Sequence, residues 1–172
     1  ESASNYLTKF AKIMRQTLEN SMQNDIPLEE DLKMLELYLQ VESMRLNNKF
    51  TYAINIENSI DLENTLVPPL ILQPFIENSI WHGLSNKASD GHIDISIKKE
   101  DNMLVCTVDD NGVGRTLKPE VDSTGNKSLG IRITKSRIDI LNKKKHANGS
   151  FKMIDKEQGV RVEVKWPLQV AF

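Results

Sequence analysis

The apolar residues of this 172-residue chain change their spacing once, near residue 48, and this change constrains the fold more than any other feature of the sequence. Before that point apolar residues recur every three to four positions, over residues 6–18 and again from Pro27 to Leu46. Such spacing predicts two amphipathic helices. The polar residues between them predict a short turn, so the helices would form an antiparallel hairpin that must bury its apolar stripe.

After residue 48 apolar and polar residues alternate, which is the pattern of half-buried strands. The segments that alternate begin at Phe50, Ile93, Leu104, Phe151 and Val160. Two further stretches, residues 69–84 and 131–144, have helical spacing. Strands in one layer and helices in the other predict a two-layer α/β sandwich with a mixed, largely antiparallel sheet.

The chain therefore divides into two parts. We expect residues 1–47 to form the helical hairpin and residues 48–172 to form one α/β domain. Residues 115–128 contain Pro, Gly and several polar residues but no periodic pattern. A loop of this length inside a compact domain is usually a functional lid or disordered, so we expect a mobile lid there.

The composition excludes several classes of protein. The 22 Lys and Arg residues nearly balance the 24 Asp and Glu residues, giving a net charge of −2, which argues against nucleic-acid binding through phosphate contacts. A single cysteine excludes an intramolecular disulfide framework and a four-cysteine zinc site. No apolar run reaches the roughly 18 residues that a membrane-spanning helix needs.

The helix predicted over residues 69–84 carries the first candidate site. Asn78 and His82 are four positions apart and would share one helix face, with Glu77 beside them. A carboxylate, an amide oxygen and an imidazole in one cluster can bind a hard cation and contact phosphate oxygens. An amphipathic helix whose polar residues merely face water remains the alternative.

The second candidate site follows a predicted strand and has the sequence Asp110-Asn111-Gly112-Val113-Gly114. Its glycines permit positive φ angles and let a ligand approach the backbone closely. An acid fixed at the end of a strand can accept a hydrogen bond from an exocyclic amine. The alternative is an ordinary tight turn, because Asp, Asn and Gly are common turn residues.

The third candidate site ends the expected lid and begins a helix, over residues 128–134. Backbone N–H groups at a helix start bind anions, and Lys127 and Arg132 add positive charge. A plain helix start explains the same residues without a ligand.

The order of these three motifs resembles the GHKL ATPase superfamily, and most closely the catalytic region of bacterial sensor histidine kinases. The segment from Pro68 to Gly83 is similar to the N box of the subgroup that works with LytTR-type response regulators. The run from Tyr6 through Pro27 to Leu39 is similar to that subgroup's histidine-kinase region. The resemblance covers almost the whole chain, and it implies a Bergerat-type ATP-binding fold with ATP and Mg²⁺ as cofactors.

The resemblance also implies a role for each motif. Asn78 would ligate Mg²⁺, Glu77 would orient a water or the attacking group, and His82 would act as a donor near the phosphates. Asp110 would bind the adenine amino group, while Gly112 and Gly114 would let the backbone close under the base. The phosphates would be held at the helix start by five consecutive residues: Lys127, Ser128, Leu129, Gly130 and Ile131.

Three positions depart from the family pattern. Ser128, Ile133 and Val160 stand where the family usually has Gly, Asn and Thr. These departures leave open a non-catalytic module that senses nucleotide or docks a partner. A serine kinase of anti-sigma type shares the ATP-binding fold but explains neither the N box nor the leading helices as well.

The three histidines, His82, His92 and His146, do not occupy the position of a phosphoacceptor. We therefore expect the acceptor histidine upstream of Glu1, in a homodimer formed through the N-terminal helices; a protein that never autophosphorylates is the alternative. The resemblance implies transfer of the ATP γ-phosphoryl group to that histidine and then to an aspartate of a response regulator of LytTR type. It also implies a cytoplasmic location, with the intact protein anchored in the membrane through an upstream segment.

Overall fold

The computed structural model describes residues 2–21, 25–88, 90–114 and 129–171. The expected lid over residues 115–128, which includes Lys127 and Ser128, lies outside the described residues. No described helix has both the length and the apolar character needed to cross a membrane.

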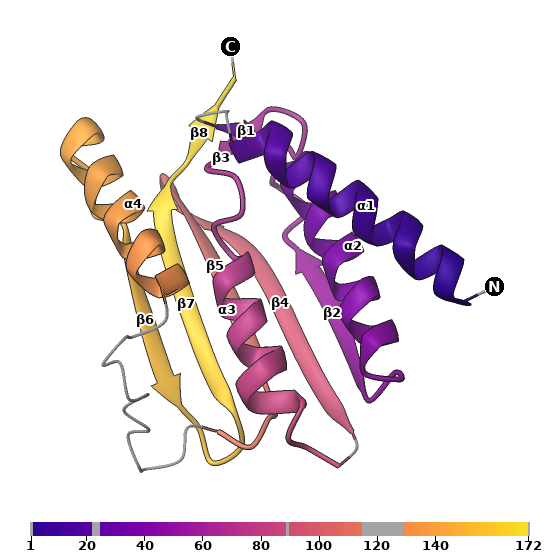
Figure 1. Ribbon diagram of the computed structural model, residues 1–172. Coiled ribbons are helices and arrows are strands. Elements are labelled where there is room, and N and C mark those ends of the chain that lie inside the picture. Colours follow the sequence, from indigo (N-terminus) through magenta and orange to yellow (C-terminus); the bar gives the residue numbers. More distant parts are fainter. Residues whose placement is uncertain (1, 22–24, 89, 115–128, 172) are drawn as a thin grey trace.

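A five-stranded sheet forms one layer of the structure, in the order β2-β4-β5-β7-β6 (Figure 1). Its first pair, β2 and β4, is parallel, and the other neighbours are antiparallel. The strands are β2 (Phe50–Ile56), β4 (Gly91–Glu100), β5 (Met103–Asp110), β6 (Ser150–Asp155) and β7 (Val160–Pro167). The predicted mixed, largely antiparallel sheet is confirmed.

Helices cover one face of this sheet and form the second layer (Figure 1). They are α2 (Leu28–Arg45), α3 (Gln73–Asn78), the π-helix η1 (Ser79–Leu84) and α4 (Leu129–Lys145). The core between the layers includes Phe75 and Trp166, each 1% exposed, together with isoleucines of β4. The two-layer α/β sandwich predicted from the alternating pattern is therefore correct.

A second, small sheet was not predicted. It joins β1 (Ile26–Pro27), β3 (Thr65–Val67) and β8 (Gln169–Val170) in the order β1-β3-β8. Strands of two or three residues are too short to show a hydrophobic period. This sheet ties the start of α2 to the C-terminal end of the chain.

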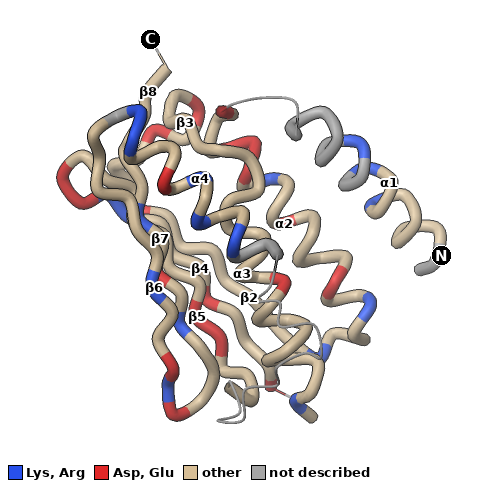
Figure 2. The backbone as a smooth tube through the Cα atoms, turned by 60° about the vertical axis from the view of Figure 1, so that its left-hand side comes forward, with Lys and Arg blue, Asp and Glu red and all other residues tan. Residues whose placement is uncertain are grey.

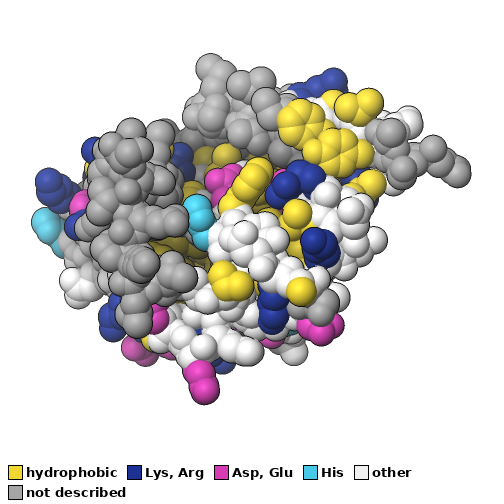
Figure 3. Space-filling view, turned by 60° about the horizontal axis from the view of Figure 1, so that its bottom comes forward, with side chains coloured by type: hydrophobic (Ala, Val, Ile, Leu, Met, Phe, Trp, Pro, Cys, Tyr) yellow, Lys and Arg dark blue, Asp and Glu magenta, His cyan; other side chains and the backbone are white. Residues whose placement is uncertain are grey.

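The first helix, α1 (Ser2–Ser21), packs along α2 rather than on the sheet (Figure 2). The Lys9 ammonium donates a hydrogen bond to Gln40 Oε1 of α2 at 2.7 Å. The helical hairpin is thus confirmed, but its apolar stripe is not fully buried. Leu7 and Phe10 are 63% and 45% exposed, and hydrophobic side chains gather over this helix in Figure 3.

The predicted helix over residues 69–84 differs from the observed one in two respects. It begins only at Gln73, because Leu70 has a φ angle of +61°, outside the helical region. Its second half is a π-helix, in which the Ser85 N–H donates to the Ile80 carbonyl oxygen, five residues earlier. Both features coincide with contacts to distant parts of the chain: the Leu70 N–H donates to Asp31, and η1 contacts Asp110 and Val113.

A buried acid connects the hairpin to the rest of the structure. Asp31 of α2 accepts a hydrogen bond from the Leu70 N–H at 2.8 Å, and Arg137 of α4 donates to the Pro69 carbonyl oxygen at 2.6 Å. Burial raises the pKa of Asp31 from 3.8 to about 6, although the Leu70 N–H and the Arg137 charge act in the opposite direction. The fold therefore disfavours the charged form of Asp31 relative to the unfolded chain.

We predict that this raised pKa makes stability depend on pH. A carboxyl group with a folded-state pKa above its unfolded value contributes stability below the unfolded pKa and loses it as the pH rises through the folded one. Between pH 4 and pH 7 this group should lower the free energy of unfolding by up to about 3 kcal/mol. Asp31→Asn keeps an acceptor for Leu70 and should remove that decrease, as measured by urea denaturation at a series of pH values.

Asp139→Asn provides the control for this measurement, since Asp139 is an exposed acid on α4. Equal pH dependence in the wild-type chain and in Asp31→Asn would contradict the prediction.

Candidate functional site

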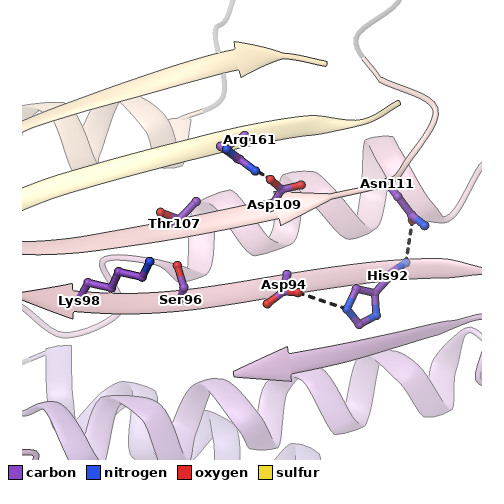
Figure 4. A pocket seen from close by; sticks show the side chains of 8 residues that line it. All are labelled: His92, Asp94, Ser96, Lys98, Thr107, Asp109, Asn111 and Arg161. Atoms are coloured by element: carbon purple, nitrogen blue, oxygen red, sulfur yellow. Dashed lines mark hydrogen bonds and ion pairs between the residues drawn. The ribbon is translucent and has the colours of Figure 1, made fainter. Parts of the chain in front are cut away.

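The site is built around Asp110, the last residue of β5. Adjacent residues of a strand point to opposite faces of the sheet, so Asp109 and Asp110 have different surroundings. Asp109 lies on the open face, where it pairs with Arg161 (Figure 4) and with Lys156. Asp110 lies on the face covered by helices and is only 3% exposed.

Neutral donors from separate elements hold the Asp110 carboxylate. The Ser79 hydroxyl of η1 donates to Oδ2 at 2.7 Å. The N–H groups of Gly112 and Val160 donate to Oδ1 at 2.9 Å and 3.2 Å. Such contacts offset the cost of burying a charged group, which is several kcal/mol when it has no partner.

Glycines allow these elements to meet. A Cβ at Gly112 would lie 2.5 Å from Gly83 Cα, and a Cβ at Gly159 would lie 1.9 Å from the Asp110 carbonyl oxygen. Gly159 also has a φ angle of +78°, which side chains of L-amino acids rarely adopt. The Val113 N–H donates to the Gly83 carbonyl oxygen at 3.1 Å and closes the contact between η1 and the turn after β5.

The turn that contains Gly112 is fixed by its asparagine. The Asn111 side chain accepts a hydrogen bond from the His92 N–H at 2.7 Å and donates to the Asp90 carbonyl oxygen at 2.9 Å. Lys87 donates to the Asn111 carbonyl oxygen at 2.8 Å. The turn is therefore anchored to the start of β4, and Asp110 is held in one place.

The first motif, which consists of Glu77, Asn78 and His82, lies on α3 and η1, close to Asp110. Glu77 and Asn78 end α3 and are half-buried, whereas His82 lies in η1 and is exposed. Glu77 accepts a hydrogen bond from the Gln73 side chain at 3.0 Å. Burial, with Glu42 and Glu77 nearby, raises the pKa of Tyr38 on α2, so Glu77 lies on the side of the site that faces the hairpin.

An exposed tryptophan of η1 also contacts the hairpin. The guanidinium carbon of Arg45, at the end of α2, lies 4.2 Å from the centroid of the Trp81 ring. Glu42 orients that guanidinium through an ion pair at 2.6 Å. Cation–π contacts at such distances stabilise an interface by about 0.5–1 kcal/mol when exposed.

The described residues contain no group of three or more His, Cys, Asp or Glu side chains that could hold a metal ion. Glu77 and Asn78 nevertheless supply neighbouring carboxylate and amide oxygens, the donors that a hard cation prefers. A Mg²⁺ ion bound here would take its remaining ligands from water and from the ligand itself, as this ion commonly does.

The third motif is described only in part. Leu129, Gly130 and Ile131 form the first turn of α4, in agreement with the helix start predicted there. Gly114, at the end of the second motif, has a φ angle of +74° and lies next to Gly159. The structure thus brings together Asp110, Gly112 and Gly114, whereas Lys127 and Ser128 lie outside the described residues.

Ser79, Gly83 and Gly159 also belong to this site but were not predicted from the sequence. Ser79 directly follows Asn78, and Gly83 lies four residues further on. Each would have been found by asking which small or hydroxyl-bearing residues could face the acid of the second motif. That question needs the pairing of distant elements, which a single sequence does not provide.

A groove of about 500 Å³ lies on the open face of the sheet, away from Asp110 (Figure 4). Its acids already have partners: Asp94 accepts a hydrogen bond from Asn55 at 2.8 Å and lies 3.7 Å from His92 Nε2, and Asp109 pairs with Arg161. The two acids of this groove are thus already paired, whereas Asp110 accepts only three hydrogen bonds from the described residues.

The chain is similar to known histidine kinases. Residues 1–50 match a family model described as histidine kinase. The sensor histidine kinase/phosphatase LytS of Staphylococcus aureus is 35% identical over 115 residues, which are 66% of this chain and 19% of LytS. The chain therefore spans about a fifth of the length of the LytS proteins that it matches.

Solved structures of low identity share the fold. The histidine kinase domain of a blue-light activated histidine kinase from Erythrobacter litoralis EL346 has a TM-score of 0.63 at 17% identity, covering 98% of this chain and 75% of that one. Histidine kinase ThkA, solved in complex with response regulator protein TrrA, has a TM-score of 0.58 at 19% identity, covering 95% of this chain and 48% of that one.

The close contact of Gly112 with Gly83 leads to a stability prediction. Gly112→Ala places a methyl group 2.5 Å from a backbone atom, so the free energy of unfolding should fall by about 1–3 kcal/mol. Gly114→Ala is the control, because its Cβ would approach no such atom within 3.8 Å and only its φ angle of +74° opposes the change. Urea denaturation should show the larger loss in Gly112→Ala, and equal stability of the two variants would contradict the packing argument.

Proposed function

Because the chain belongs to the sensor histidine kinases, we propose that it binds ATP with Mg²⁺ and supplies the γ-phosphoryl group to a histidine upstream of Glu1. The observation that carries this proposal is the buried Asp110 carboxylate, held by neutral donors between Gly83, Gly112 and Gly159. From the histidine the phosphoryl group passes to an aspartate of a response regulator.

Asp110 binds the exocyclic amino group of adenine in this proposal. A carboxylate offers about four lone-pair positions, and three of those on Asp110 accept donors from the chain. The remaining position is on Oδ2. Gly112 and Gly114 keep the adjacent backbone free of side chains, so a flat base can lie close to it.

Glu77, Asn78 and His82 act on the phosphate side of the site. Asn78 ligates Mg²⁺, which neutralises charge on the triphosphate when bound. Glu77 orients the attacking group, and its position toward α2 supports this role because the acceptor histidine is expected to come from the helical side of the molecule. His82 is exposed and free to donate to a phosphate oxygen.

The first turn of α4 holds the phosphates. Leu129, Gly130 and Ile131 have backbone N–H groups at the start of a helix of 17 residues, where the dipole favours an anion. Lys127 and Ser128, which precede this turn in sequence and lie outside the described residues, are included in this proposal as further phosphate-binding residues.

The intact protein acts as a homodimer with a response regulator of LytTR type as its partner. The exposed Leu7 and Phe10 of α1 support association through the N-terminal helices, because apolar side chains on a helix favour packing against another chain. The resemblance of the N box supports the choice of response regulator. A segment upstream of Glu1 anchors the intact protein in the membrane, with this region on the cytoplasmic side.

We predict that Asp110→Asn weakens the binding of ATP with Mg²⁺ by about 10- to 150-fold, the effect of losing a hydrogen bond to a charged group. Asp109→Asn is the matched control, since Asp109 lies on the opposite face of the same strand and pairs with Lys156 and Arg161. Isothermal titration calorimetry measures both variants. Unchanged binding in Asp110→Asn would disprove the assigned site.

An assay of phosphoryl transfer distinguishes a kinase from a non-catalytic module of the same fold. The departures from the family pattern at Ser128, Ile133 and Val160 favour the non-catalytic module. The chain is mixed with the histidine-bearing dimerisation region of a LytS-type kinase and with γ-labelled ATP. We expect label on the histidine, and about 100-fold slower labelling in Glu77→Gln with unchanged ATP binding, because Glu77 acts on the attacking group. ATP binding without any label on the histidine would instead support the docking module.

The departure at Val160 does not by itself weaken the site. Val160 contacts Asp110 through its backbone N–H, and this bond does not depend on the side chain. Ser79 supplies a hydroxyl to the same carboxylate from the other side.

A further inference from the structure

The contact between Ser79 and Asp110 has no counterpart among the roles assigned above. The Ser79 hydroxyl donates to Asp110 Oδ2 at 2.7 Å, and the two residues are 6% and 3% exposed. Ser79 lies at the first position of the π-helix η1, directly after Asn78. Asp110 Oδ2 is the oxygen that keeps an open acceptor position. Because the Ser79 hydroxyl is buried against it, Ser79 can determine which ligand group Oδ2 accepts.

The other oxygen of Asp110 is fully used. Oδ1 accepts the N–H groups of Gly112 and Val160, which fix the plane of the carboxylate from one side. Ser79 fixes it from the other side, so the remaining lone pair of Oδ2 has a defined direction. Since Oδ1 is saturated, Asp110 is left with one acceptor position rather than the two parallel ones that a guanine edge would need.

We propose that Ser79 is a specificity-determining residue of the nucleotide site, selecting a purine with a 6-amino group by aiming Asp110 Oδ2 at it. This inference rests on the proposed ATP-binding function. The hydroxyl proton of Ser79 is committed to Asp110 and cannot be donated to a ligand. A 6-oxo purine would therefore bring its carbonyl oxygen against an acceptor with no donor to meet it.

Removal of the Ser79 hydroxyl changes how Asp110 Oδ2 is directed at a ligand. In Ser79→Ala the carboxylate keeps its Oδ1 contacts but loses the bond that directs Oδ2. Binding of 6-amino purines should weaken, whereas binding of purines without that amino group should not.

The test measures the affinity of the 172-residue chain for three nucleotides in the presence of Mg²⁺. These are ATP, purine riboside triphosphate and inosine triphosphate. Purine riboside triphosphate lacks the 6-amino group, and inosine triphosphate carries a 6-oxo group in its place. In the wild-type chain we expect ATP to bind at least about tenfold more tightly than either analogue. In Ser79→Ala we expect ATP affinity to fall about tenfold and the affinities for both analogues to change less than about twofold. The preference for ATP would then be largely lost.

Ser85→Ala is the matched control, because Ser85 directly follows η1 and its hydroxyl donates to the Trp81 carbonyl oxygen, away from Asp110. It should leave all three affinities unchanged. Thermal denaturation of each variant reports whether the fold is intact, and Ser79→Cys, which keeps the size of the side chain but is a weak donor, should give an intermediate ATP preference.

Four outcomes are distinguishable. An equal fall of all three affinities in Ser79→Ala shows a merely structural role and overturns the inference, as does an unchanged preference for ATP. Failure of the wild-type chain to bind ATP at all disproves the proposed function itself. Loss of ATP preference in Ser79→Ala with a wild-type thermal transition supports the inference.

Discussion

Burial of the Asp110 charge is the constraint on which the arrangement of the site depends. A carboxylate at the end of a central strand, 3% exposed, is stable only if donors replace the water that it loses. Its donors come from η1, from the turn after β5 and from the start of β7. These elements can converge only where side chains are absent, which is why Gly83, Gly112 and Gly159 surround the acid. The charge of Asp110 therefore accounts for its contact with η1, for the three glycines around it and for the path of the turn after β5.

A second buried acid links this site to the helical hairpin. Asp31 of α2 holds the Leu70 N–H, while Arg137 of α4 holds the neighbouring Pro69 carbonyl oxygen. The loop between these contacts leads directly into α3, which ends with Glu77 and Asn78. The hairpin and α4 thus each hold one of two adjacent residues in the same loop. A shift of α2 must displace the loop or break a buried contact, so the position of the hairpin and the geometry of the N-box helix are mechanically connected.

The sequence predicted the elements that are long enough to show a period. The five strands of the large sheet and the helices α1, α2 and α4 follow the expected ranges closely. The start at Gln73 and the π-helix were not predictable, because Leu70 adopts its φ of +61° in a contact with Asp31, which is 39 residues away in sequence. The same reason explains the omission of Ser79, Gly83 and Gly159. Their importance comes from contacts between distant segments, and the resemblance to a known family identified only the acid that they surround.

The two adjacent acids of β5 show why one of them is suited to a ligand and the other is not. Asp109 is neutralised by the cations Lys156 and Arg161 on the solvated face of the sheet. The donors to Asp110 are a hydroxyl and two backbone N–H groups, which fix the carboxylate without cancelling its charge. A neutral N–H donor gains more from a bond to a charged acceptor than from one to a neutral acceptor. Because the alternation of the strand gives these acids opposite faces, a shift of one residue in the register of β5 would exchange them and abolish the site.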